Sequence, residues 1–373
     1  MDSKINVRLL SGSHPIYETL LKYPPANITY LTNIKSTDFE TLKIYQSKNY
    51  NFKKSLVLSA LNLLRLPRIY FVINSADVIH SSRGLLILNR SPWVVDVEHA
   101  SSFGDYTKKQ VRFLVKQLLK SKYCKKILPH CEAARKSILN GYDCKDFRTK
   151  LEVLYPAIMP HKIAKANEIP TILFIGKWVS FYRKGGKELI QAFKILEQKY
   201  DINLILKTDA PREFIKKYEK DRSILFAAET ISREEVFEKF YLKSDIFVMP
   251  TFVDSFGYVF LEAMSCGLPV VGTDIFAVPE IIENGKNGFL VHSNISDFKP
   301  NFLHRDIHKS IDYSKIKAPE VVRGLVEALT ILIENKPLRK KMGRTGYKMV
   351  ESGKFSIKQR NEKLKRIYEE AIE

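Results

Sequence analysis

The sequence predicts an α/β fold in which strands and helices alternate along nearly the whole chain and are divided between two domains. Short apolar runs rich in β-branched residues, typical of buried strands, are separated by segments with helical periodicity. Such alternation indicates parallel sheets joined by crossover helices. The chain has 373 residues, which suits two domains better than one, and 45% of them are hydrophobic, enough to form buried cores.

The first half of the chain, residues 1–160, is predicted to form an N-terminal α/β domain. Its strands are expected at Val7–Leu10, Ile28–Leu31, Ile69–Ile73, Val78–His80, Val94–Val97, Lys126–Pro129 and Leu151–Leu154. Its helices are expected at Tyr17–Lys22, Leu56–Arg65, Lys108–Ser121 and Ala133–Asn140. Scattered prolines without a clear period then indicate a linker at 161–170.

A second alternating series, residues 171–350, is predicted to form a C-terminal domain. Its strands are expected at Thr171–Ile175, Asn203–Leu206, Ile224–Phe226, Ile246–Val248, Pro269–Gly272 and Phe289–Val291. Its helices are expected at Lys187–Lys199, Arg212–Lys220, Arg233–Leu242, Tyr258–Ser265, Val278–Ile282, Pro319–Glu334 and Leu338–Glu351. The last segment, 351–373, contains a charged helix that we expect to return to the N-terminal domain.

One long segment, Ser293–Lys317, interrupts this alternation and is predicted to be a loop. It contains His304 and His308 at a spacing of four residues, but nothing nearby in the sequence completes a metal site. We therefore interpret it as a surface loop.

Composition limits the class of protein. No apolar run reaches the roughly 18 residues that a membrane span needs, and the N-terminus lacks the pattern of a signal peptide, so we expect a soluble cytoplasmic protein. The formal net charge is +20. Residues 101–150 carry 13 Lys and Arg against 4 Asp and Glu, so an anionic surface would meet the first half of the chain. A lysine-rich solvated surface explains the charge equally well.

The stretch from Ser244 to Gly272 is the most informative part of the sequence, because it predicts strand, loop, helix, turn and strand in succession. Loops after parallel strands lie at the edge of the sheet where α/β proteins bind ligands. The backbone N–H groups around Ser255–Tyr258 would form the positive end of a helix, which suits a diphosphate. Glu262 follows Tyr258 by one helical turn, and its carboxylate could accept two ribose hydroxyls.

Asp254, eight positions before Glu262, would lie on the other side of the diphosphate. At about 1.5 Å per helical residue the two carboxylates are on the order of 10 Å apart, roughly the span from ribose to sugar in a nucleotide-sugar. The alternative is a solvated Glu and a loop Asp that caps a helix.

Asp254, seven intervening residues and Glu262, followed by Ala263-Met-Ser-Cys-Gly-Leu-Pro-Val-Val271, resemble the acidic-x7-Glu signature of retaining glycosyltransferases with the GT-B fold. This large family is the "glycosyl transferases group 1" family. The resemblance implies an α/β protein with two Rossmann-like domains that face each other across a cleft. The family usually has Glu at the first acidic position and Ser-Phe-Gly or Gly-Phe-Gly after it; this chain has Asp254 followed by Ser255, Phe256 and Gly257.

Further positions match the family's donor-binding residues. Gly176-Lys177 resembles the end of its first C-terminal strand, and Arg183-Lys184-Gly185 resembles the basic turn that opens the next helix. The resemblance implies that Lys177 and either Arg183 or Lys184 bind the donor diphosphate, where a cation stabilises the charge of the leaving phosphates. Ser255, Phe256, Gly257, Tyr258 and Glu262 complete the implied donor site, with Asp254 and Lys184 as catalytic residues.

The N-terminal half resembles the family less closely. Ala76–His80 and Val94–His99 follow the order of two family strands, of which the second ends in a His that faces the donor sugar. His99 is therefore implied as a catalytic contact to the donor sugar, with a structural or merely exposed His as the alternative. Gly12 and Ser13 stand where the family has a Gly-Gly loop, and they are candidates for acceptor binding.

The resemblance implies a retaining hexosyltransferase that moves a sugar from a nucleotide-diphosphate donor to an acceptor hydroxyl. The acceptor would be a glycan or a lipid-linked molecule. No cofactor and no metal are expected, because lysines and helix N–H groups take the place of a metal. Two alternatives remain: a nucleic-acid-binding protein or DNA-glucosylating enzyme, for which no recognised motif appears, and a nucleotide-sugar epimerase or inactive sugar-binding relative.

A basic amphipathic helix predicted at Lys108–Ser121 suggests a second surface. Val111, Leu114, Val115 and Leu118 form its apolar stripe, and Lys108, Arg112, Lys116 and Lys120 recur every four residues on another face. It is either an ordinary domain helix with solvated lysines or a surface that docks on anionic lipid. The second interpretation would place the protein peripherally on the inner face of a membrane.

Overall fold

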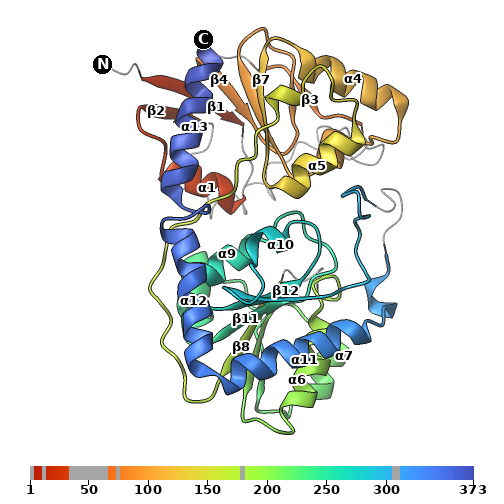
Figure 1. Cartoon of the computed structure of the whole chain (residues 1–373), viewed down its shortest axis with the longest axis vertical. Coiled ribbons are helices and arrows are strands. Elements are labelled where there is room, and N and C mark those ends of the chain that lie inside the picture. The colour runs from red at the N-terminus through yellow and green to blue at the C-terminus, as the bar shows by residue number, and fades with distance from the viewer. Residues whose placement is uncertain (1–3, 11–13, 33–65, 73–75, 177–180, 305–310) are drawn as a thin grey trace. The chain divides into compact units, whose positions relative to one another are not determined.

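The computed structural model describes residues 4–10, 14–32, 66–72, 76–176, 181–304 and 311–373. The chain forms two compact units (Figure 1). Unit 1 comprises residues 1–157, 299–307 and 357–373, and unit 2 comprises 158–298 and 308–356. Residues 152–167, which join them, contain no helix or strand. Each unit is described by itself.

Unit 1 is built on a parallel sheet with the strand order β2-β1-β4-β6-β7. Its strands are β1 (Ile5–Leu10), β2 (Ile28–Leu31), β4 (Val78–Ser81), β6 (Trp93–Val97) and β7 (Cys124–Pro129). Every residue of β4 and β6 is buried, as expected for parallel strands covered on both faces. A separate pair, β3 (Ile69–Tyr70) and β5 (Leu86–Ile87), forms a short parallel ribbon.

The helices of unit 1 are α1 (Pro15–Lys22), α4 (Lys109–Lys120), α5 (Glu132–Gly141) and α13 (Ile357–Ile372), with short 3-10 turns η1 (Ala100–Phe103) and η2 (Arg148–Lys150). The last helix, α13, packs beside β4 and β7 (Figure 1). It is anchored by Arg360, whose guanidinium donates to Thr19 Oγ1 at 2.9 Å and to the Tyr23 carbonyl at 2.8 Å.

The long segment between the last strand of unit 2 and the next helix of that unit contributes a short stretch to unit 1. The Asn140 side chain donates to the Asn301 carbonyl at 3.0 Å, and Lys136 lies 5.2 Å from the centre of the Phe302 ring. Leu303 packs against the core of unit 1. Residues 299–304 therefore form a loop, as predicted, whose residues are exposed or half-buried and which is docked on unit 1. His308 lies outside the described residues.

Unit 2 has a parallel sheet with the order β10-β9-β8-β11-β12-β13. Its strands are β8 (Thr171–Ile175), β9 (Asn203–Lys207), β10 (Ile224–Phe226), β11 (Ile246–Met249), β12 (Val270–Thr273) and β13 (Gly288–Val291). Its helices are α6 (Gly186–Leu196), α7 (Arg212–Tyr218), α8 (Arg233–Lys239), α9 (Tyr258–Ser265), α10 (Val278–Ile281), α11 (Pro319–Glu334) and α12 (Lys336–Glu351), with 3-10 turns η4 (Tyr241–Lys243) and η5 (Tyr313–Lys315).

The order of the unit 2 strands reverses between β8 and β11. From β8 the chain proceeds outward to β9 and β10, then returns to β11 on the other side of β8 and proceeds to β12 and β13. At such a switch point the loops that follow the two central strands diverge to opposite faces and leave room for a ligand. The loops after β8 and β11 are the ones that carry the predicted donor-site residues.

Two sequence predictions of secondary structure need correction. Leu151–Leu154 is not a strand: Leu151 forms an isolated bridge with Ile127, and Glu152 and Leu154 donate backbone hydrogen bonds along β7 without continuing the ladder. The two-residue strand β5 was not predicted, because two residues are too few to show a period. The predicted helix at Leu56–Arg65 lies outside the described residues.

Candidate donor site at the β8–β11 switch point

The loops after β8 and β11 are joined by an ion pair across the switch point of unit 2. Lys184 Nζ lies 2.6 Å from Asp254 Oδ2 and 2.9 Å from the Val253 carbonyl oxygen. Both side chains are only about 15% exposed. The pair therefore places an ammonium and a carboxylate together at the carboxyl edge of the sheet, where a charged ligand would meet both.

The turn that carries Lys184 packs closely against the β11 loop. Gly185 caps α6 with a left-handed φ of 75°, and a Cβ there would lie 2.2 Å from the Pro250 carbonyl oxygen. Only glycine fits this approach. The backbone carbonyl of Arg183 accepts from the Phe252 amide at 2.9 Å, and the Arg183 side chain is exposed. The structure thus turns Lys184, and not Arg183, toward Asp254.

Helix α9 begins directly after this pair. Its N-cap is Gly257, with φ 90°, which has no side-chain acceptor to offer the first helical amides. The first turn, from Tyr258 to Phe260, contains no acidic residue. Asp254 Oδ1 accepts from the Phe256 amide at 3.3 Å, so the carboxylate shapes the approach to the helix without capping it. The positive end of α9 therefore lies beside an ammonium group, an arrangement that suits an anion.

Glu262 lies on α9 one turn further along and is almost fully buried. Its Oε1 accepts from Arg233 Nη2 at 3.0 Å, and its Oε2 accepts from the Tyr241 hydroxyl at 2.8 Å. Burial and then the Glu262 charge raise the pKa of Tyr241 well above its ordinary value, so Tyr241 stays a neutral donor. Each carboxylate oxygen can accept a second hydrogen bond, which leaves capacity for ligand hydroxyls.

This part of the chain is similar to known proteins. Residues 169–303 match the family model described as "Glycosyl transferases group 1". The chain is 28% identical over 242 residues to the capsular polysaccharide biosynthesis glycosyltransferase CapM of Staphylococcus aureus; the alignment covers 61% of this chain and 52% of CapM. It is 26% identical over 265 residues to an uncharacterised 41.2 kDa protein in the cps region of Klebsiella pneumoniae, covering 62% of this chain and 71% of that protein.

Residues 169–303, most of which lie in unit 2, form a region similar to the glycosyl transferases group 1 family, and we call this region the group 1 domain.

The fold is shared with solved structures. The crystal structure of Anabaena Alr3699/HepE in complex with UDP-glucose superposes with a TM-score of 0.62 at 13% identity, covering 97% of this chain and 98% of that one. The predicted α/β fold class with two Rossmann-like domains is confirmed. The predicted cleft concerns the placement of the two units and stays a prediction.

The group 1 domain brings together most of the predicted donor residues. Lys184 and Asp254 are in direct contact, and Ser255, Phe256, Gly257, Tyr258 and Glu262 follow on the same loop and helix. Lys177 lies outside the described residues, as do Gly12 and Ser13. Among the described residues, no three His, Cys, Asp or Glu side chains gather as a metal site requires. The expectation that catalysis needs no metal stays a prediction.

Two residues beside Glu262 were not predicted. Arg233 begins α8 and lies over the rings of Phe237 and Tyr258, at 5.7 and 5.6 Å, while it binds Glu262. Tyr241 lies in η4. In the sequence, Ser232 and Glu235 reveal the start of α8 through a capping box, but no spacing shows that Arg233 reaches a helix 29 residues later.

His99 belongs to unit 1, where it follows β6 and opens η1. Its Nδ1 lies 2.8 Å from Ser101 Oγ, and its ring meets the His304 ring edge to face at 4.9 Å. Burial, and then the neighbouring His304, lower the pKa of His99 to about 4. His99 is therefore neutral near pH 7 and can act as a hydrogen-bonding group; its role toward a donor sugar stays a prediction.

Helix α4 only partly matches its predicted amphipathic pattern. Val111, Val115 and Leu119 are buried, whereas Leu114 is 39% exposed and does not belong to the buried stripe. Two of the four predicted lipid-binding cations have acidic partners: Lys116 lies 2.7 Å from Asp143 and 3.1 Å from Asp146, and Lys108 lies 3.8 Å from Asp105. Arg112 and Lys120 are exposed.

Proposed function

We propose that this chain is a glycosyltransferase whose group 1 domain binds a nucleotide-diphosphate sugar and transfers the sugar to an acceptor hydroxyl with retention of configuration. The observation that carries the proposal is the Lys184–Asp254 pair beside the N-terminus of α9, at the switch point of a parallel sheet. This arrangement offers an ammonium and helix amides to a diphosphate and a carboxylate to the donor sugar.

The proposed reaction breaks the bond between the anomeric carbon and the oxygen of the β-phosphate. The acceptor oxygen forms its bond to the same face of the anomeric carbon, and its proton passes to the departing diphosphate. Lys184 stabilises the negative charge that develops on that diphosphate. Glu262, held by Arg233 and Tyr241, receives the ribose hydroxyls. His99 is the proposed contact to the donor sugar from unit 1.

The assay for this proposal measures release of nucleoside diphosphate from a panel of nucleotide-sugars in the presence of a chelator. A transferase releases the diphosphate and yields a glycoside whose anomeric configuration, read by proton NMR, matches that of the donor. An epimerase yields an isomeric nucleotide-sugar instead, and an inactive relative yields neither. The proposal would be contradicted if thermal shift detected binding of no nucleoside diphosphate.

We also propose that α4 contacts an anionic membrane, which would suit a lipid-linked acceptor or a surface glycan. Lys109, Arg112, Phe113 and Lys120 share one exposed face of α4, and Phe113 is 64% exposed among these cations. The adjacent ribbon of β3 and β5 ends in two exposed apolar side chains, Phe71 at 71% and Leu88 at 54%.

Exposed aromatic side chains among cations are typical of surfaces that lie in the lipid headgroup region. No helix in the part of the chain that the structure describes is long and apolar enough to span a bilayer. A peripheral position on the inner face of a membrane is the proposed location. The capsule-related name of CapM is in keeping with glycan assembly at such a surface.

A further inference from the structure

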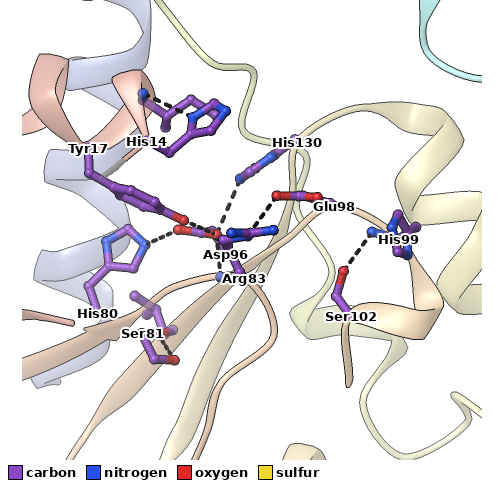
Figure 2. Close-up of polar contacts among 12 residues, drawn as sticks. His14, Tyr17, His80, Ser81, Arg83, Asp96, Glu98, His99, Ser102 and His130 are labelled. Carbon is purple, nitrogen blue, oxygen red and sulfur yellow. Dashed lines mark hydrogen bonds and ion pairs between the residues drawn. The ribbon is translucent and has the colours of Figure 1, made fainter. Parts of the chain in front are cut away.

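The carboxyl edge of the unit 1 sheet gathers polar side chains from four neighbouring strands. These strands, β1, β4, β6 and β7, lie next to one another and run parallel, so the loops that follow them meet at one edge. Figure 2 shows the side chains that lie there: His14, Tyr17, His80, Arg83, Asp96, Glu98, His99 and His130. The order of the strands reverses between β1 and β4, so this edge is also a switch point.

Asp96 is the buried centre of this group. Its Oδ1 accepts from the Tyr17 hydroxyl at 2.9 Å and lies 3.3 Å from His130 Nε2, and its Oδ2 lies 3.5 Å from His80 Nε2. Burial opposes its ionisation, but hydrogen bonds with His130 and His80 outweigh burial and hold the pKa of Asp96 well below its usual range. Asp96 is therefore a carboxylate that is held from several sides (Figure 2).

The same carboxylate fixes the turn that follows β4. Asp96 Oδ1 also accepts from the Arg83 backbone amide at 2.9 Å, and the Asp96 carbonyl accepts from the Gly84 amide at 2.8 Å. Arg83 has a left-handed φ of 53°, which a side chain other than glycine rarely adopts. A strained backbone that persists because its surroundings hold it is often found at a binding site.

The strained turn directs Arg83 toward Glu98. Arg83 Nε lies 3.0 Å from Glu98 Oε1, and Figure 2 shows the two side chains meeting beside Asp96. The Arg83 side chain is 54% exposed and that of Glu98 is 19% exposed, so this pair has access to solvent. An exposed ion pair by itself contributes little to stability, which gives no reason to hold Arg83 in a strained conformation.

We propose that Arg83 and Glu98 form a binding site for vicinal hydroxyls of a sugar or polyol acceptor, and that Asp96 is the residue that positions them. This inference rests on the proposed function, because it assigns the acceptor side of the same reaction. Glu98 can accept from two adjacent hydroxyls, and the Arg83 guanidinium donates in a fixed fork to hydroxyl or ring oxygens. The negative charge of Glu98 disfavours a phosphate on the bound part of the acceptor.

The experiment uses the full chain saturated with UDP and measures saturation-transfer NMR from the protein to methyl β-D-glucopyranoside, methyl α-D-mannopyranoside, methyl β-D-galactopyranoside and myo-inositol. Glucose 1-phosphate is the phosphate-bearing comparison. The wild type is expected to transfer saturation to at least one neutral probe and more weakly to glucose 1-phosphate. Glu98→Gln should reduce the neutral signal at least fivefold while UDP affinity stays unchanged.

Two variants of Arg83 separate the guanidinium from the turn. Arg83→Gly removes the side chain but suits the left-handed backbone, whereas Arg83→Ala removes the side chain and keeps the strain. Both should lose the probe signal to the same extent, although Arg83→Gly should have the higher melting temperature. Asp77→Asn changes an exposed carboxylate of unit 1 that binds the Asn6 amide, and it should leave the signal unchanged.

The positioning role of Asp96 has its own readout. With the best probe as acceptor, Asp96→Asn should raise the acceptor KM at least fivefold and leave the donor KM unchanged, whereas general damage to the fold would alter both. The proposal is overturned if the wild type transfers saturation to no neutral probe, or if Glu98→Gln matches the wild type. If UDP binding is retained in either case, the acceptor-site proposal is wrong while the proposed donor site is unaffected.

Discussion

The carboxyl edges of the two sheets carry the same kinds of residue but differ in how deeply the carboxylates are buried. In unit 2 a lysine and an aspartate meet on loops that reach solvent, next to a helix N-terminus without a side-chain cap. In unit 1 an aspartate is buried among two histidines and a tyrosine, and Arg83 and Glu98 beside it have access to solvent.

The difference shows how burial decides the role of a carboxylate. Asp254 can exchange its partner for a ligand, because a lysine side chain has several rotatable bonds and both side chains keep about 15% of their surface exposed. Asp96 cannot do so, because removal of a buried charge from its partners is costly. The first arrangement suits a site that binds and releases a diphosphate, and the second suits a scaffold that holds neighbouring groups in place.

The largest expected effect is on the stability of unit 1. Asp96→Ala leaves the Tyr17 hydroxyl and the Arg83 amide without their acceptor, and His80 and His130 without their charge partner. It should therefore lower the free energy of unfolding of unit 1 by about 3–5 kcal/mol. Native-state hydrogen exchange of the β6 and β7 amides measures this loss. The β8 and β11 amides should be unaffected, and Asp77→Ala should cost less than about 1 kcal/mol. Equal losses of protection in the two units would contradict the role of Asp96 as a buried centre of unit 1 alone.

The next largest effect is on turnover. Lys184→Ala should lower the rate of diphosphate release by about 100-fold or more, which is the usual consequence of removing one group that stabilises a developing negative charge. Lys194→Ala is the matched control: Lys194 lies on α6 but pairs with Asp221 at 2.9 Å on the surface. A Lys184→Ala enzyme with normal turnover would show that the cation of the site lies elsewhere.

Glu262 offers a test of nucleotide affinity. With UDP as the probe nucleoside diphosphate, Glu262→Gln should bind the probe about 10- to 100-fold more weakly than the wild type does, because hydrogen bonds to charged groups are worth about 1.5–3 kcal/mol. Replacing UDP with 2′-deoxy-UDP should cost the wild type a similar factor and cost Glu262→Gln much less. Calorimetric titration of both proteins with both ligands measures this coupling. If the losses from the Glu262→Gln substitution and from the missing 2′-hydroxyl simply added, Glu262 would not bind the ribose.

The pKa of His99 tests whether the polar group of unit 1 is buried. Its folded value of about 4 lies below the ordinary value near 6.5. Between pH 4 and pH 6.5 His99 binds a proton in the unfolded chain but not in the folded one. The free energy of unfolding therefore has its full value from this residue above pH 6.5 and decreases as the pH falls toward 4. Histidine NMR titration, assigned with His99→Asn, should show this midpoint. His292, whose pKa Asp274 raises, should titrate above its ordinary value.

The smallest expected effect concerns lipid. Each of Lys109→Ala, Arg112→Ala and Lys120→Ala should weaken binding to vesicles that contain phosphatidylserine by about fivefold at low salt, since a surface cation is worth about 1 kcal/mol there. Lys116→Ala should have less effect, because Asp143 and Asp146 already neutralise Lys116. Sedimentation measures binding. Equal binding of the wild type to neutral and anionic vesicles would contradict the proposal.

Local patterns predicted most of the fold. Helix α9 runs from Tyr258 to Ser265 as expected, because glycines at 257 and 267 mark its ends. The strand–helix alternation of unit 2 is reproduced within a few residues at each end. The docking of residues 299–304 on unit 1 was not predicted, because it depends on contacts of Leu303 and Phe302 with residues more than 150 positions away, which periodicity does not record.

The site was predicted less completely, for the same physical reason. The family resemblance pointed to Lys184 and Asp254, but the choice between Arg183 and Lys184 depended on the close packing of Gly185 against Pro250. The partners of Glu262 come from α8 and η4, which only the folded sheet brings near α9. The Asp96 group likewise depends on the adjacency of β4, β6 and β7.

Hydrogen exchange of the wild-type chain with and without UDP, in the presence of a chelator, tests the central claim most directly. UDP, used as the probe nucleoside diphosphate, should slow exchange in peptides covering residues 181–186 and 250–262, and Lys184→Ala should remove most of this protection. Binding of UDP that leaves these two segments unchanged, or protection that appears only when a divalent metal is added, would contradict that claim.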